Sequence, residues 1–219
     1  DSNKSPEMMA RVVEIVNSLN PDLIVITGDL IDGRITDDRL FCQSLKKLKA
    51  TRGIFSITGN HEFYSGLSYF LELSRKLNFT VLRNDLKIID QHLQVIGLDD
   101  NEAKRFSQPG PDLDTPLKRC DPTKPIIVLR HRPEGFDQAV EKGVDLQISS
   151  HTHDGQIPPI TCLVRLFFKY PYGLYEKNGA FIYTSCGTGY WGPPMRLFSR
   201  AEIVEFILVS NSIKREPVG

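Results

Sequence analysis

Apolar residues recur at helical spacing near the start of the chain, at Met9, Val12, Val13, Val16 and Leu19. This period predicts a helix within residues 5–20, with Ser5 as its N-cap and Pro6 in its first turn. Residues 23–27, LIVIT, then form a short continuous apolar run, which is typical of a strand that is buried on both faces. The chain therefore opens as a helix followed by a strand.

The alternation of helical and strand patterns continues along the chain. Helical periodicity predicts further helices over residues 38–49 and 66–77. Short apolar or β-branched runs predict strands at residues 53–58, 80–82, 87–89, 93–98, 125–129, 145–149 and 180–184. Residues 201–209, AEIVEFILV, fit a strand or a helix, and their β-branched residues favour a strand. This order predicts an α/β fold with one large sheet or two stacked sheets.

Composition narrows the class of protein. The chain has 219 residues, 40% of them hydrophobic, and its 27 basic residues balance its 27 acidic ones. A net charge of zero argues against a nucleic-acid partner bound through bulk charge. No run of 18 apolar residues indicates a membrane span. The four cysteines are far apart and form neither a zinc-ribbon pattern nor a dense disulfide framework.

Four polar motifs come directly after predicted strands. They are GDLID at residues 28–32, GNHEFY at 59–64, HRP at 131–133 and SHTHDG at 150–155. Ligand and catalytic groups in open α/β sheets collect outside the carboxyl ends of the strands. We therefore expect the four motifs to meet at one edge of the fold.

Four of the five histidines lie in these motifs, together with aspartates and an asparagine. Imidazole nitrogens combined with carboxylate or amide oxygens suit Zn, Mn or Fe rather than calcium. The donors are too many for one tetrahedral structural zinc, whereas a two-metal site accommodates them. In an extended segment, residues i and i+2 point to the same side, so His151 and His153 are expected to face one cleft.

These motifs resemble those of the calcineurin-like metallophosphoesterase superfamily, whose pattern is D-x-H, GDxxD, GNH(E/D), H and GHxH. Four of the five motifs are present between residues 28 and 153, with Ser150 in place of the glycine of the last one. Flanking stretches such as GTGYWGPPMRLFSRAEI are similar to a membrane-associated branch that includes bacterial phosphodiesterases. The resemblance implies two stacked mixed β-sheets flanked by helices, a four-layer αββα sandwich.

The resemblance also implies a ligand set for two divalent metal ions, either Mn, Zn or Fe. Asp29 would bridge both ions. Asn60, His131 and His151 would complete the second metal site, and His153 would bind the first metal. Two such cations can activate a shared water and clamp phosphoryl oxygens for in-line attack.

A second pair of residues is expected to carry proton transfer. By the resemblance, His61 would be the catalytic histidine near the leaving group, held by Asp32. His61 could donate a proton to the departing alkoxide while Asp32 fixes its tautomer. Glu62, the next residue of the GNHE motif, is expected to serve structure.

The D-x-H motif is absent from the chain. By the family's spacing it belongs a few residues before Asp1, so we expect a single domain over residues 1–219 that is truncated just after this motif. As written, the chain would hold the second metal and would hold the first poorly. Asp1 is a weaker substitute, because its position does not match.

The leading functional interpretation is a metal-dependent phosphoesterase that cleaves a phosphodiester or pyrophosphate bond of a small molecule, either lipid-linked or a sugar nucleotide. Two alternatives stay open. One is a non-catalytic metal-binding or scaffold domain, which the missing D-x-H would permit. The other is a phosphoprotein phosphatase, for which the sequence gives no special peptide-binding signal. The resemblance implies membrane association in a bacterium, although the chain itself has the composition of a soluble domain.

One stretch is not explained by these motifs. Residues 163–170, LVRLFFKY, combine large apolar side chains with two cations. We expect a loop that packs on the core. The alternative is a segment that rests on a bilayer surface or grips an acyl chain, and membrane association of the family strengthens it.

Overall fold

The computed structural model describes residues 6–33, 38–192 and 194–209. Its helices are α1 (Pro6–Ser18), α2 (Asp38–Leu45), α3 (Asn60–Ser65), α4 (Leu67–Leu77), η2 (Asn101–Phe106), α5 (Asp114–Leu117), α6 (Phe136–Glu141), η3 (His153–Gly155) and α7 (Ile160–Phe167). Its strands are β1 (Ile24–Ile26), β2 (Ile54–Ser56), β3 (Thr80–Val81), β4 (Asp85–Ile89), β5 (Leu93–Gly97), β6 (Ile126–Leu129), β7 (Leu146–Ser149), β8 (Gly173–Lys177) and β9 (Ala180–Thr184). Ser5 and Asp1, for which the sequence suggested an N-cap and a substitute ligand, lie outside the described residues.

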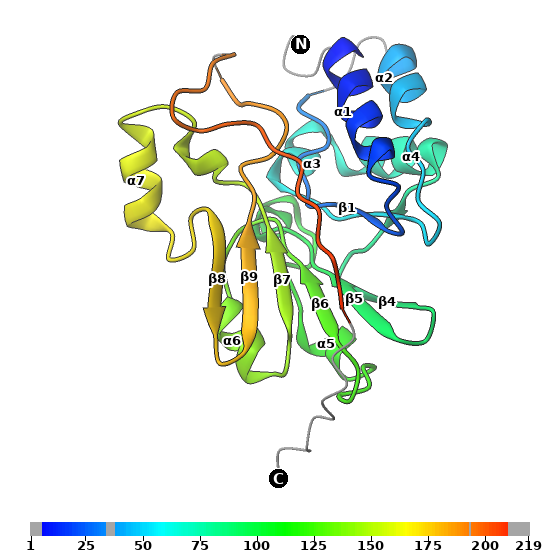
Figure 1. The fold of residues 1–219 in the computed structure, drawn as a ribbon, viewed down its shortest axis with the longest axis vertical. Coiled ribbons are helices and arrows are strands. Elements are labelled where there is room, and N and C mark those ends of the chain that lie inside the picture. The colour runs from blue at the N-terminus through cyan, green and yellow to red at the C-terminus, as the bar shows by residue number, and fades with distance from the viewer. Residues whose placement is uncertain (1–5, 34–37, 193, 210–219) are drawn as a thin grey trace.

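Two sheets stack in the middle of the molecule, and helices cover their outer faces (Figure 1). The smaller sheet has the order β1-β2-β3 and is parallel throughout. The larger has the order β4-β5-β6-β7-β9-β8, with parallel pairs in the centre and an antiparallel pair at each end. The expected αββα sandwich is therefore confirmed, and β4 and β5 form an antiparallel hairpin at one end of the larger sheet.

Strand β6 shows why the larger sheet lies inside the molecule. All four of its residues are buried, and successive side chains point to opposite faces. Ile127 and Leu129 join the apolar cluster between the two sheets, together with Phe55 of β2. Ile126 and Val128 join the cluster on the other face, together with Ala139 of α6. A continuous apolar run is what a strand covered on both faces requires.

The outer face of the small sheet is covered by three amphipathic helices. Met9 and Val13 of α1 pack in one cluster with Phe41 of α2 and Phe70 of α4. The loop after β1 contributes Ile31, which is completely buried in the same cluster. This packing fixes the loop that begins with Gly28, and so it positions the first polar motif.

Two expectations from the sequence are wrong. Residues 201–209 form no strand and run as an extended segment across the molecule (red in Figure 1). A backbone hydrogen bond holds this segment, from the Glu202 N–H to the Gly187 carbonyl, together with side-chain contacts. Glu202 accepts a hydrogen bond from the Cys186 N–H, and Phe206 packs on the cluster between the sheets. Within the stretch 163–170, residues 163–167 belong to helix α7, which has no buried residue, rather than to a loop packed on the core, whereas Tyr170 packs in a core cluster as expected.

We expect Leu129→Ala to lower the free energy of unfolding by about 3 kcal/mol, because the side chain is completely buried between the sheets and its removal leaves a cavity. Urea denaturation followed by circular dichroism would measure the change. Leu174→Ala, at a β8 side chain that is 61% exposed, is the matched control and should change stability by less than about 0.5 kcal/mol. Equal losses in both variants would contradict the position assigned to β6.

Candidate metal centre

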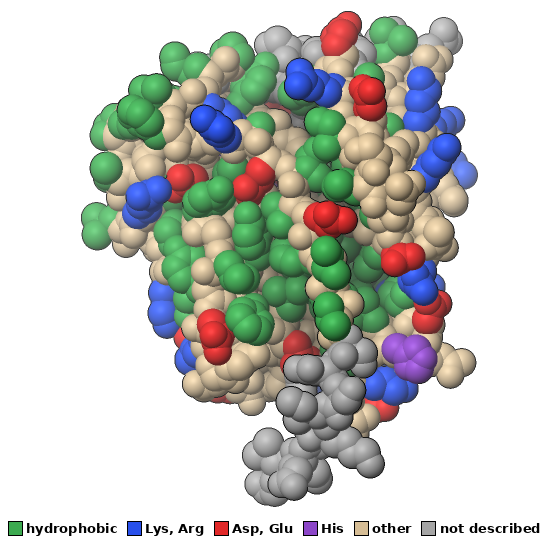
Figure 2. All heavy atoms as spheres, viewed as in Figure 1, with side chains coloured by type: hydrophobic (Ala, Val, Ile, Leu, Met, Phe, Trp, Pro, Cys, Tyr) green, Lys and Arg blue, Asp and Glu red, His purple; other side chains and the backbone are tan. Residues whose placement is uncertain are grey.

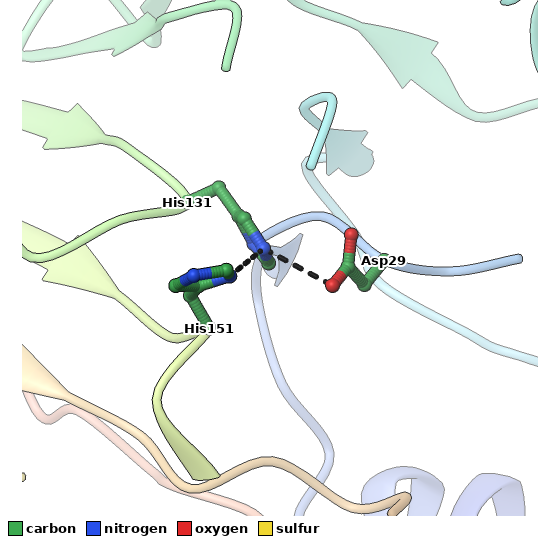
Figure 3. A group of neighbouring side chains, drawn as sticks. All are labelled: Asp29, His131 and His151. Carbon is green, nitrogen blue, oxygen red and sulfur yellow. Dashed lines mark hydrogen bonds and ion pairs between the residues drawn. The ribbon is translucent and has the colours of Figure 1, made fainter. Parts of the chain in front are cut away.

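Loops that follow four strands of the two sheets bring one residue from each of the four polar motifs together. Asp29 follows β1, and Asn60 begins α3 shortly after β2. His131 follows β6 and His151 follows β7, both from the larger sheet. Figure 3 shows Asp29, His131 and His151 pointing toward one another. The expected convergence at one edge therefore includes these four side chains.

The Nε2 atom of His131 lies at the centre of the group. It is 3.1 Å from Oδ2 of Asp29, 3.2 Å from Oδ1 of Asn60 and 3.1 Å from Nδ1 of His151. Donor atoms that surround Zn²⁺ tetrahedrally at about 2.0 Å lie about 3.3 Å from one another. The three contacts of His131 Nε2 are close to this spacing, and the ligand atoms of Asp29, His131 and His151 all lie within 4.8 Å of one another. A carboxylate, an amide oxygen and two imidazoles are donors that suit a divalent cation of the Zn, Mn or Fe class.

The other nitrogen of His131 is fixed by the backbone. Its Nδ1–H donates to the carbonyl of Thr27 at 2.8 Å, and the Ser150 hydroxyl donates to the same carbonyl at 2.9 Å. A proton held on Nδ1 leaves the lone pair of a neutral imidazole on Nε2, which faces Asp29 and His151. The β1 loop therefore selects the tautomer that can bind a metal.

Charges in the group shift its pKa values strongly. Burial acts to lower the pKa of His131, but the charge and hydrogen bond of Asp29 outweigh it and raise this pKa to about 9. Burial acts to raise the pKa of Asp29, but His131 and His61 outweigh it and hold this pKa well below its usual range. Burial and then the charge of His131 lower the pKa of His151 to about 3. Without a cation, His131 therefore carries the proton and His151 is neutral.

Two glycines allow the β1 and β2 loops to cross in contact. Gly28 has a φ of +91°, and a Cβ there would lie 2.6 Å from the Gly59 nitrogen. A Cβ on Gly59 would lie 2.2 Å from Oδ1 of Asp29. Only residues without side chains fit both positions, which is why the aspartate and the asparagine reach the same point.

The Glu62 carboxylate ties these two loops together. It is completely buried and accepts hydrogen bonds from the N–H groups of Gly59 at 2.6 Å, Asp29 at 2.8 Å and Ile31 at 3.2 Å. A carboxylate that accepts backbone N–H groups makes strong charge-assisted bonds. The structural role expected for Glu62 thus has a physical basis, because it fixes the loops that present Asp29 and Asn60.

His61 and Asp32 form a separate pair at the opening of the site. Nδ1 of His61 lies 2.7 Å from Oδ1 of Asp32, and its ring remains about 29% exposed. The backbone N–H of His61 donates to Oδ1 of Asp29. One hydrogen bond thus joins this pair to the group around His131. Nε2 of His61 is the ring nitrogen that does not contact Asp32.

The extended geometry expected for the SHTHDG motif is wrong. His151 and His153 have φ values of 72° and 51°, so the motif forms a left-handed turn rather than an extended strand end. Nδ1 of His153 lies 3.1 Å from Nη2 of Arg196. A guanidinium only donates, so this nitrogen accepts and a neutral ring carries its proton on Nε2. For His153 to bind a cation, its contact with Arg196 must open.

Arg196 is the residue near this site that sequence reasoning missed. Its guanidinium donates to the carbonyls of Cys186 and Gly189 as well as to His153. Burial lowers the pKa of Arg196, although Cys186 and Glu202 act in the opposite direction. A lone arginine in a loop gives no local signal of this role, because its partners are distant in sequence.

Comparisons with known proteins agree with this geometry. A sequence model of the calcineurin-like phosphoesterase family matches residues 4–155. An uncharacterized metallophosphoesterase of Helicobacter pylori is 39% identical over 203 residues, which are 92% of this chain and 55% of the relative. A transmembrane protein with metallophosphoesterase domain from Danio rerio is 35% identical, over 91% of this chain and 48% of the relative. The chain thus spans about half the length of these two relatives.

A third relative is covered more fully. The metallophosphoesterase YkuE of Bacillus subtilis is 31% identical over an alignment of 219 positions, which covers 94% of this chain and 74% of the relative. The similarity to all three relatives extends well beyond the four motifs. It therefore includes the strands that place the metal-ligating group.

We expect Glu62→Gln to lower the free energy of unfolding by about 2–3 kcal/mol, because the amide NH₂ would meet a backbone N–H donor in a buried site. Urea denaturation would measure the change. Glu72→Gln, at an exposed α4 side chain paired with Lys76, is the matched control and should cost less than about 0.5 kcal/mol. A neutral effect at Glu62 would contradict the role given to its carboxylate.

We expect the affinity of the site for Mn²⁺ or Zn²⁺ to rise with pH. The proton on His131, with its pKa of about 9, must leave before Nε2 can bind a cation, whereas His151, with its pKa of about 3, is already neutral. Loss of one proton predicts a Kd that falls about tenfold per pH unit below pH 9. Calorimetry in buffers of different ionisation enthalpy would count the released proton, with His92→Ala at an exposed turn as control. A Kd independent of pH would exclude the His131 assignment.

Proposed function

Because the chain belongs to the calcineurin-like phosphoesterase family, we propose that it hydrolyses a phosphodiester or pyrophosphate bond at the group formed by Asp29, Asn60, His131 and His151. Membership of this family implies phosphoester hydrolysis with divalent metals. The bond type, the second metal ion and the substrate belong to the proposal.

The observation that carries the proposal is the contact of His131 Nε2 with three other donors, all within 3.2 Å. These four side chains would hold one divalent cation. Cations in such sites lower the pKa of water and neutralise phosphoryl oxygens. The protein's own contribution is to hold the donors in place, through the Thr27 carbonyl behind His131 and the Glu62 carboxylate behind Asp29.

His61 is proposed as the proton donor to the leaving group. The Asp32 carboxylate accepts a hydrogen bond from Nδ1–H of His61, so the ring can present a protonated Nε2 toward a departing alkoxide. Its partial exposure at the edge of the site leaves room for the leaving group. Asp32 acts as a positioning residue because it fixes the ring without touching the reacting atoms.

The proposal includes a second cation, bridged by Asp29 and bound by His153. Its remaining ligands would come from the D-x-H motif, expected before Asp1. Binding at His153 requires that Arg196 release Nδ1. Displaced from His153, the guanidinium would lie beside the centre as a cation able to meet a phosphoryl oxygen.

The substrate proposed is a small molecule that carries a phosphodiester or pyrophosphate, either lipid-linked or a sugar nucleotide. Two relatives of this chain are named transmembrane proteins, which supports a substrate at a membrane. If D-x-H does not precede Asp1 in the whole protein, the alternative of a metal-binding scaffold gains support. A phosphoprotein phosphatase would instead favour phosphomonoesters.

We expect Asn60→Ala and His131→Ala each to lower kcat/KM for bis-p-nitrophenyl phosphate with Mn²⁺ by about a hundredfold or more, because each removes a metal ligand. The assay uses this chain and, if the encoded protein begins before Asp1, the longer protein as well. His92→Ala is the control histidine, exposed in the turn between β4 and β5. Full activity in either ligand variant would exclude the site, and faster cleavage of p-nitrophenyl phosphate would exclude a diesterase.

We expect the loss of kcat caused by His61→Ala to depend on the leaving group of the substrate. A general acid contributes about 10²–10⁴-fold when the leaving group is a strong base, and much less when it is a nitrophenolate. The loss of kcat should therefore be far larger with a methyl or alkyl leaving group than with p-nitrophenolate. An equal loss with both substrates would show that His61 does not donate the proton.

A further inference from the structure

Helix α7 exposes an apolar face. Leu163, Leu166 and Phe167 are 50%, 79% and 78% exposed, and the helix has no buried residue. At a step of 100° per residue, these three side chains lie within an arc of about 100°. A helix of a monomeric domain normally turns such a face toward its core. Here the half-buried side chains, including Val164, face the domain, and the large ones face outward.

A neighbouring loop extends this apolar surface. The loop is held beside α7 by Gln156, which accepts from the Trp191 N–H and whose carbonyl accepts from the Leu197 N–H. Leu197 and Phe198 of the loop are 53% and 86% exposed. Figure 2 shows hydrophobic side chains gathered over this part of the molecule, at the left of the view. We define the α7 patch as Leu163, Leu166, Phe167, Met195, Leu197 and Phe198.

The part of the chain that contains the α7 patch is rich in basic residues. Residues 155–201 contain five cations and one acid, a net charge of +4 in a chain whose net charge is zero. The cations are Arg165, Lys169, Lys177, Arg196 and Arg200. Three adjoining carboxylates offset part of this charge: Asp154 pairs with Arg165, Asp137 pairs with Lys169 and Lys177, and Glu202 accepts from the Tyr172 hydroxyl, which leaves an excess of one positive charge. The exposed apolar side chains of α7 therefore lie next to two exposed cations, Arg165 in the helix and Lys169 just after it, which are 59% and 66% exposed.

The patch adjoins the metal-ligating group. Phe168, at the end of α7, contacts His151 edge to face, with ring centroids 6.0 Å apart. A hollow of about 360 Å³ beside the helix is lined by Arg165, Lys169, Phe168, Pro171, Tyr172 and Tyr175. Aromatic side chains next to cations are typical of protein surfaces that lie at a membrane interface.

We propose that the α7 patch rests on the surface of an anionic bilayer. The apolar side chains would enter the boundary between headgroups and acyl chains, and the cations next to them would meet lipid phosphates. Positive charge argues for this partner, because an anionic bilayer offers both an apolar layer and negative charge. Docking would bring phosphate-bearing headgroups close to His151. The docking itself does not depend on the proposed hydrolysis, so each can fail without the other.

The test is flotation of the chain with vesicles of phosphatidylcholine, with or without phosphatidylglycerol, in a buffer that contains EDTA. We expect binding to the anionic vesicles that weakens as salt is added. The double variant Leu166→Ser, Phe167→Ser should bind about tenfold more weakly or worse, because both side chains lose their apolar contact with lipid. Leu40→Ser, at a leucine 52% exposed on α2, is the matched control and should bind like the unchanged chain.

Each other outcome decides against the proposal. Equal binding by the double variant, or equal binding to vesicles with and without phosphatidylglycerol, would overturn it. Failure to bind vesicles, together with a dimer in sedimentation velocity that the double variant abolishes, would assign the patch to a second copy of the chain. Thermal melting should show the double variant folded, because it changes only exposed side chains. Hydrolysis of bis-p-nitrophenyl phosphate by the same variant would report separately on the metal centre.

Discussion

The hydrogen bond between His131 Nδ1–H and the Thr27 carbonyl links the two sheets at the metal-ligating group. His131 follows β6 of the larger sheet, and Thr27 follows β1 of the smaller one. The bond therefore constrains how the larger sheet is positioned against the smaller one. It also decides which nitrogen of His131 faces Asp29, so the same contact serves the fold and the chemistry.

The surrounding loops hold Asp29, Asn60, His131 and His151 together, and the charges within this group depend on one another. A buried carboxylate and a buried imidazole satisfy each other only while His131 keeps its proton. Glu62 and the two glycines hold the loops so closely that the group cannot spread apart. A divalent cation would replace that proton and let His151 join as a ligand. The four proposed ligands are thus held together by the surrounding loops, which is the preorganisation that the proposed metal site would need.

The surface around α7 lies close to this centre. The turn that presents His151 and His153 is followed within a few residues by the helix, whose last contact is made by Phe168 on His151. Arg165 of the helix pairs with Asp154 in the same turn. A partner bound to α7 would therefore lie next to residues that directly contact the turn of His151 and His153. In the part of the chain that the structure describes, no helix is long and apolar enough to cross a membrane.

The sequence by itself determined the strand–loop framework and the residue types at its strand ends. Runs such as PIIVL and AFIYT predict strands because the local side-chain pattern suffices for them. The convergence of Asp29, Asn60, His131 and His151 could be expected, because loops after neighbouring strands share an edge. Only the tertiary structure decided the rest. The turn at His151, the contact of Arg196 with His153 and the exposure of α7 depend on partners distant in sequence. Residues 201–209 carry a strand-like pattern but no ladder partner in the described chain, and pairing is a property of the whole sheet.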